Sequence, residues 1–234
     1  MKILAFDSTA RSASVALLED ERLLALYNID NGLTHSELLL PMAEEILRSL
    51  RVDISEIGLF AAAVGPGSFT GVRIGASLVK GLAFGRDIPC AAVSTLEALA
   101  ENLRGTAGYI IPCMDARRAQ VYTATFLSDG RTTKRLTEDR AISFSQLSDE
   151  LRGVGEPIYL VGDGYDVAHR ALSAAGIPLA NTPPLAILQS AYSIGLVALR
   201  QHAEGRTVTD SEISATYLRV PQAERERLER LGKK

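Results

Sequence analysis

Few of the side chains that bind transition metals or form covalent cross-links occur in this sequence. It has two cysteines, three histidines and no tryptophan in 234 residues. Cys90 and Cys113 both lie inside apolar runs, which indicates buried, reduced thiols rather than a disulfide framework. The three histidines, His35, His169 and His202, are far apart in the chain, and no pair has the spacing of a zinc site. We therefore expect no metal site.

An excess of basic residues is also missing. The chain has 25 Lys and Arg against 28 Asp and Glu, a formal net charge of -3 and an isoelectric point near 5.7. A protein that binds nucleic acid unaided usually carries clustered Lys and Arg, so tight binding by this chain alone is not expected. Asp7 interrupts the first apolar run, and no run is long enough to span a bilayer. We expect no signal peptide, no membrane contact and a cytoplasmic location.

The hydrophobic content of 47% is enough for one large domain or two small lobes. Alternation and breakers predict an α/β chain in which three strands, a helix, a strand and a helix occur twice, on either side of a hinge at 105–108. The predicted strands are 2–7, 12–18, 22–29, 58–64, 89–93, 109–113, 119–127, 131–137 and 157–162. The predicted helices are 34–50, 71–84, 94–103, 145–152, 164–175 and 186–203. The predicted lobes are 1–104 and 105–221, followed by a charged tail at 222–234.

The loop GPGSFTGVR at 65–73 is the most informative stretch. Glycines let a backbone approach closely, and Thr70 is placed to cap the following helix. A glycine-rich loop before a helix can bind phosphate, but it can equally be a tight strand-to-helix turn, and the pattern leaves both open. No Walker loop, dinucleotide fingerprint or Gly-x-Ser-x-Gly elbow is present in the sequence. We expect no catalytic residue.

The helices predicted at 34–50 and 71–84 have apolar arcs wider than a one-sided surface helix needs. A second surface on these helices would account for the extra width. Ordinary burial between lobes would account for it equally well. The candidate interface residues are Leu38, Leu39, Met42, Ile46, Val72, Val79 and Ala83.

The run GPGSFTGVRIGASLVKGLAFGRDIPCAAVSTLEALA resembles the bacterial TsaB (YeaZ) family and is similar to the partner family TsaD. The resemblance continues through Asp115-Ala116-Arg117-Arg118, Val121-Tyr122, Val161-Gly162-Asp163-Gly164 and Tyr217-Leu218-Arg219, and so covers nearly the whole chain. It implies a two-lobed actin-like ATPase fold (ASKHA, ribonuclease H-like), with a mixed sheet flanked by helices in each lobe.

The resemblance also implies a vestigial nucleotide site. Its residues would be Asp7, Ser8, Gly65, Gly67, Gly162 and Gly164. For Asp7 and Ser8 the alternative is a capped turn at a strand end. TsaD carries a His-x-x-x-His metal pair where this chain has Thr95 and Leu99, and a Gly-Gly turn where it has Asp115-Ala116-Arg117. These departures imply a chain without cofactor or catalysis.

As a TsaB-like protein, the chain would be a scaffold for a TsaD-like protein, with a TsaE-like ATPase, in making threonylcarbamoyladenosine next to tRNA anticodons. The family implies that the two arc-bearing helices pair with TsaD, or with a second copy in a homodimer. Contact with tRNA is expected only within the complex. The alternative is an enzyme, either a small actin-like phosphotransferase or a metallopeptidase-like protein.

Overall fold

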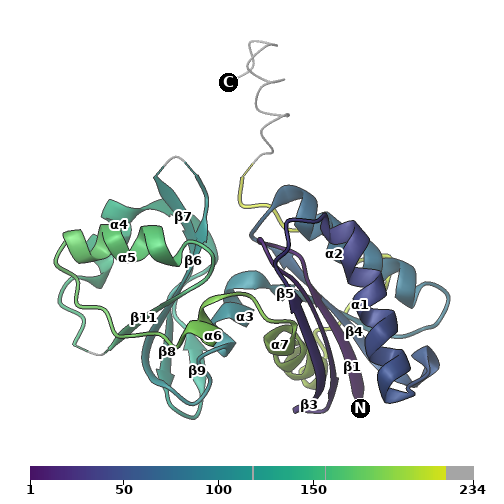
Figure 1. Cartoon of the computed structure of the whole chain (residues 1–234). Helices are drawn as coiled ribbons and strands as arrows, with labels where there is room; N and C mark the ends of the chain where they lie inside the picture. The colour runs from purple at the N-terminus through teal and green to yellow at the C-terminus, as the bar shows by residue number, and fades with distance from the viewer. Residues whose placement is uncertain (118, 156, 220–234) are drawn as a thin grey trace, which may run out of the picture.

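The computed structural model describes residues 1–117, 119–155 and 157–219, and these form two lobes side by side (Figure 1). The first lobe contains a five-stranded sheet in the order β3-β2-β1-β4-β5. Strands β1, β2 and β3 pair antiparallel, and β4 and β5 continue the sheet in parallel with β1. The bounds are β1 Lys2–Asp7, β2 Ala13–Glu19, β3 Arg22–Ile29, β4 Ile57–Gly65 and β5 Cys90–Ser94.

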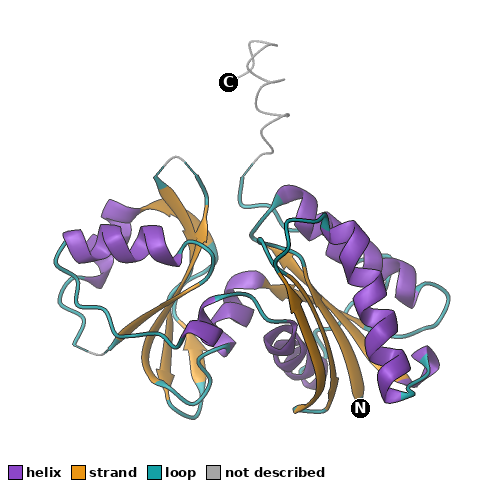
Figure 2. Cartoon of the chain, in the orientation of Figure 1, coloured by secondary structure: helices purple, strands orange, loops and turns teal. Residues whose placement is uncertain are grey.

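Helices cover both faces of this sheet (Figure 2). On one face α1 (His35–Leu50) and α2 (Phe69–Ala83) pack over a core that includes Phe6, Leu17 and Phe60. On the other face α7 (Ala191–Ala203) covers the alternate residues of the same strands. Because successive side chains of a strand point to opposite faces, strands covered on both sides are apolar throughout, and β1 and β4 have this pattern. A short 3₁₀ helix, η1 (Ile54–Glu56), leads into β4.

The second lobe is built around β6 (Ala107–Asp115). Strand β11 (Ile158–Val161) pairs with it in parallel, and β7 (Gln120–Thr123) and β8 (Phe126–Asp129) pair with it antiparallel. Thr123 lies opposite Cys113 and Phe126 opposite Ile110, so the register continues from β7 to β8. The strand predicted at 119–127 is thus one strand in two pieces, interrupted at residues 124 and 125.

The remaining elements of the second lobe differ from the prediction in two places. Strand β9 (Thr133–Arg135) pairs with β8, and β10 (Arg140–Ser143), which was not predicted, pairs with β7. The helix predicted at 186–203 is two helices, α6 (Pro184–Ile187) and α7. Helices α4 (Phe144–Leu151) and α5 (Tyr165–Ala174) cover one face of the sheet.

Two helices pack on a sheet of the lobe to which the predicted boundaries did not assign them. Helix α3 (Thr95–Glu101), inside the predicted first lobe, lies between the lobes: Leu96 and Leu99 pack on the sheet of the second lobe, and Ala98 packs in the core of the first. Helix α7, inside the predicted second lobe, packs on the sheet of the first. The predicted division at 104 and 105 separates the strands of the two sheets but stays a prediction for the helices, because sequence order does not show which sheet a helix covers. The tail predicted at 222–234 lies outside the described residues.

Candidate functional site

A cleft of about 710 Å³ lies between the lobes. Its first-lobe wall is the turn after β1 and the loop that enters α2, and its second-lobe wall is the end of β6 with the turn after β11. Residues 216–219 also line it. Of the six residues predicted for a vestigial nucleotide site, Gly67 lines the cleft, while Asp7, Ser8, Gly65, Gly162 and Gly164 lie behind its walls.

Asp7 and Ser8 end β1 with their side chains buried and bonded within the first lobe. The carboxylate Oδ1 of Asp7 accepts hydrogen bonds from the amide and hydroxyl of Thr9, at 2.8 and 2.7 Å. Burial raises the pKa of Asp7 to about 6, although both bonds from Thr9 oppose this shift. The hydroxyl of Ser8 donates to the Gly71 carbonyl at 2.8 Å. These contacts match the alternative of a capped strand-end turn.

The glycine-rich loop is shaped by a close backbone approach between β1 and α2. A Cβ on Gly67 would lie 2.5 Å from the Thr9 carbonyl oxygen, and one on Gly71 would lie 1.8 Å from that of Ser8. The helix cap differs from the prediction, because α2 begins at Phe69 and Ser68, not Thr70, accepts the Gly71 amide at 3.2 Å. The glycines are thereby explained by packing within the lobe.

The second-lobe wall brings two carboxylates together at the cleft. Gly164 donates its amide to the Cys113 carbonyl at 2.9 Å, which holds the turn after β11 against the end of β6. This places the side chain of Asp163 where it accepts the Asp115 amide at 3.3 Å. Burial raises the pKa of Asp163 above its usual range, and the nearby Asp115 carboxylate adds a smaller shift in the same direction. Two carboxylates thus lie at this wall, while Arg11, Arg117 and Arg219 line the same cleft. The exclusion of a phosphate, expected from the replacement of a Gly-Gly turn by Asp115-Ala116-Arg117, stays a prediction.

The two positions that the resemblance matched to a TsaD histidine pair belong to the hydrophobic interior. Thr95 and Leu99 on α3 are 0% and 1% exposed, and Leu99 packs in the core between α3 and the second sheet. Within 1–117, 119–155 and 157–219, no cluster of three or more His, Cys, Asp or Glu is suited to hold a metal ion. Over the same ranges no helix is both long and apolar enough to cross a bilayer.

Helices α1 and α2 form a second hollow on the outer surface of the first lobe, a groove of about 550 Å³. Leu40, Ile74 and Leu78 provide much of its apolar lining, and Leu40 is 41% exposed. The groove is lined by Ser36, Leu39, Leu40, Phe69, Thr70, Arg73, Ile74, Ser77 and Leu78.

The interface residues predicted on these helices need correction. Most of them are at most 4% exposed, namely Leu39, Met42, Ile46, Val72, Val79 and Ala83, and all of these except Val72 belong to the core between the helices and the sheet. Leu38 is half-buried against the same core. Only Leu39 reaches the groove, at its floor. Periodicity located the apolar arcs but did not show which edge faces outward.

Residues 216–219 are a part of the cleft that the sequence prediction missed. Tyr217 and Arg219 belong to a run that was noted only for its resemblance. The aromatic and guanidinium groups two residues apart were the available signal, but nothing in the sequence placed them at the cleft.

Comparison with known proteins gives the family. The family model described as "TsaD: tRNA N6-adenosine threonylcarbamoyltransferase" matches residues 32–192. The Escherichia coli protein named tRNA threonylcarbamoyladenosine biosynthesis protein TsaB is 31% identical over 94% of this chain and 95% of its own length. A Bacillus subtilis protein of the same name is 35% identical over 69% of this chain and 71% of its own. The chain belongs to the TsaB (YeaZ) family.

A solved structure of a TsaB-family protein supports the fold as well. YeaZ from Pseudomonas aeruginosa superposes with a TM-score of 0.77 at 26% identity, covering 93% of this chain and 100% of that one. The two-lobed α/β fold expected from the family resemblance is thereby confirmed.

Proposed function

We infer that the chain is a cytoplasmic, non-catalytic subunit that binds a TsaD-like threonylcarbamoyltransferase through the groove between α1 and α2. The observation that carries this proposal is the apolar groove itself, on a helix pair that is already packed on its other side. The groove has a volume of about 550 Å³. Its lining presents leucine and isoleucine side chains, with Arg73 at its edge. A partner helix with a complementary apolar stripe fits such a surface.

Burial of the groove supplies the driving force for association. Each aliphatic side chain that a partner covers fully contributes about 1.5–3 kcal/mol before the costs of association are subtracted. A few such side chains are needed to overcome those costs. Association therefore requires a wide apolar arc on two adjacent helices, because one exposed leucine would not overcome these costs.

The non-catalytic role rests on what occupies the positions where TsaD has its chemistry. The positions of the TsaD histidine pair hold Thr95 and Leu99, which are packed in the interior. Asp115 and Asp163 stand together at the second-lobe wall of the cleft. In this proposal TsaD provides the catalytic groups, a TsaE-like ATPase joins the assembly, and tRNA is bound only within it.

Titration calorimetry with a TsaD-like protein from the same organism tests the proposal. The test variants are Leu40→Glu and Ile74→Glu, which place a carboxylate in the groove. A buried charge without a counter-ion costs several kcal/mol, so affinity should fall by roughly a hundredfold or more. The matched control is Leu50→Glu, on the same helix and 38% exposed but outside the groove.

Folding of all variants is checked by circular dichroism. Full affinity of both groove variants would overturn the assignment of this surface. Stoichiometric metal in the purified chain, with peptide or ATP hydrolysis lost on chelation, would overturn the non-catalytic role and favour the enzyme alternative.

A further inference from the structure

Residues Thr216–Arg219 line the cleft and run from the first lobe to the second, and we refer to this segment as the strap. In Figure 1 the end of the described chain, in yellow, lies at the upper end of the space between the lobes, near α2 and β7. Its first-lobe end contacts Phe69 and Arg73, which also line the groove, whereas its second-lobe end contacts no groove residue. Each end of the strap is attached to a different lobe.

The first-lobe attachment combines a backbone bond with an aromatic stack. The amide of Thr216 donates to the Val64 carbonyl at 2.7 Å. The ring of Tyr217 lies 4.7 Å from that of Phe69, centre to centre. Arg73 completes the stack, with its guanidinium 3.9 Å from the Phe69 ring centre and its Nε donating to the Tyr217 hydroxyl at 2.6 Å.

The second-lobe attachment is a single guanidinium. Arg219 donates from Nη1 to the Ala116 carbonyl at 2.7 Å and from Nη2 to the Gln120 side chain. Its guanidinium carbon lies 5.4 Å from the centre of the Tyr122 ring. The planar fork of arginine reaches two acceptors at once, so one side chain fixes both position and orientation.

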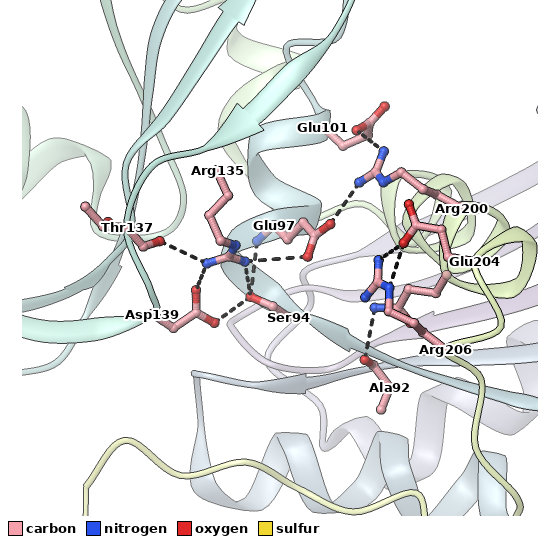
Figure 3. Close-up of polar contacts among 11 residues, drawn as sticks. Ala92, Ser94, Glu97, Glu101, Arg135, Thr137, Asp139, Arg200, Glu204 and Arg206 are labelled. Carbon is pink, nitrogen blue, oxygen red and sulfur yellow. Dashed lines mark hydrogen bonds and ion pairs between the residues drawn. The ribbon is translucent and has the colours of Figure 1, made fainter.

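The lobes are also joined away from the strap, by the ion network drawn in Figure 3. Arg135 of β9 donates to the Ser94 hydroxyl at 3.3 Å and lies 3.5 Å from the Glu97 carboxylate. Glu97 in turn accepts from Arg200 of α7 at 2.9 Å. These contacts tie β9 of the second lobe to α3 and α7, so one part of the interface is fixed independently of the strap.

We propose that the strap is a latch that sets the separation of the two lobes, with the Arg135 network as the pivot about which they open. Rigid lobes joined at one side open by hinge motion unless a second contact closes the other side. The strap is such a contact, because its ends are bonded to opposite walls of the cleft. Release of either end leaves the pivot intact and allows the cleft to widen.

The distance between spin labels on the two lobes tests the latch in the full chain. Labels are attached at Glu44→Cys on α1 and Arg170→Cys on α5, both exposed. The native thiols do not compete, because burial raises the pKa of Cys90 to about 11 and of Cys113 to about 12. The distance distribution is measured by double electron–electron resonance.

Arg219→Ala is the primary variant, because its contacts lie away from the α1–α2 groove. The latch predicts a broader distribution shifted to longer distances than in the unaltered chain. Arg206→Ala is the matched control, since Arg206 pairs with Glu204 near the end of α7 and its ion pair does not cross the lobes. Its distribution should equal that of the unaltered chain.

Tyr217→Ala removes the aromatic stack at the opposite end of the strap but leaves the Thr216 backbone bond, and it should also shift the distribution to longer distances. Thermal melting checks whether each variant is folded. The latch is overturned if a folded Arg219→Ala variant has the same distance distribution as the unaltered chain. If only Tyr217→Ala is folded, an unchanged distribution in that variant overturns the latch instead. Partner binding has no part in this measurement, so a failure of the latch is distinct from a failure of the proposed function.

Discussion

Asp7 holds a carboxyl group at a position that water does not reach. It is 1% exposed, and its pKa is raised to about 6 by burial. The hydrogen bonds from Thr9 and the nearby His35 only partly offset the loss of hydration. At neutral pH the native chain therefore carries a buried carboxylate whose ionisation opposes folding.

Asp7→Asn should be more stable than the unaltered chain at pH 8. At pH 4 the stability gained by this substitution should be much smaller. The pKa of Asp7 rises from 3.8 to about 6 on folding, so its protonated form favours the native state at low pH. That contribution is lost as pH rises through about 6, whereas Asn has no proton to lose. The stability difference between the two chains should change by about 2–3 kcal/mol between pH 4 and pH 8.

Urea unfolding at pH 4, 6 and 8 measures the difference directly. Because the chains differ at one residue, the remaining titratable groups contribute alike to both. A stability difference that is independent of pH would contradict the raised pKa of Asp7.

Leu39→Glu and Met42→Glu should unfold the chain rather than only block association. These side chains are 1% and 4% exposed and pack in the core beneath α1. A charge forced into that core costs several kcal/mol, which is a large part of the stability of a domain. Melting by circular dichroism, beside Leu40→Glu on the exposed side, distinguishes the two outcomes. A cooperative melt of Met42→Glu near that of the unaltered chain would contradict the packing.

Two glycines of helix α2, Gly71 and Gly81, lie on a packed face and an open face of the helix. Gly71 lies against the backbone of Ser8, whereas a Cβ on Gly81, in the last turn, would have no heavy atom within 4 Å. The two positions share a helix and a residue type but differ in the space around them. Position along an element therefore matters less than the neighbour that the element meets.

Gly71→Ala should lower the free energy of unfolding by about 1–3 kcal/mol or more, because the added methyl overlaps a fixed carbonyl. Gly81→Ala should raise it by about 0.5–1 kcal/mol, since alanine restricts the unfolded chain and fits an exposed helix position. Denaturant titration of the pair measures both signs. Equal effects would show that helix propensity alone governs the two sites.

The sequence predicted most elements of the first lobe because local patterns control them. The strands at 2–7 and 22–29 match β1 and β3, and the helix at 34–50 differs from α1 by one residue. Strand β10 was missed because it is only partly buried, which weakens the apolar alternation. The attachment of α7 to the first sheet was missed because it depends on contacts between residues far apart in the chain, such as the Ala191 amide and the Ser14 hydroxyl, 177 residues apart, which no local pattern reports.

The site was predicted less completely than the fold, also for physical reasons. Gly67, predicted for a vestigial nucleotide site from a glycine loop before a helix, lines the cleft, and its role in such a site stays a prediction. Tyr217 and Arg219 contact Phe69 and Ala116, which are more than 100 residues earlier in the chain. Contacts of that kind arise from the tertiary structure and leave no spacing to detect.

The whole chain should bind tRNA weakly, and by charge alone. With a net charge of -3, attraction to phosphate is limited to local basic groups. Binding that releases counter-ions from phosphate falls as salt rises, so filter binding should show a steep loss between about 50 and about 200 mM salt. Submicromolar binding that does not respond to salt would contradict this expectation.

The crossing of α3 and α7 between the lobes has a consequence for the order of synthesis. Strands β1, β2 and β4 leave the ribosome early, but one face of their sheet is covered by Ile194, Val197 and Ala198, near the end of the chain. Until that helix is made, this apolar face has no native cover, and intermediates with exposed apolar surface are prone to aggregate. The N-terminal lobe therefore cannot mature before the C-terminal lobe has been translated.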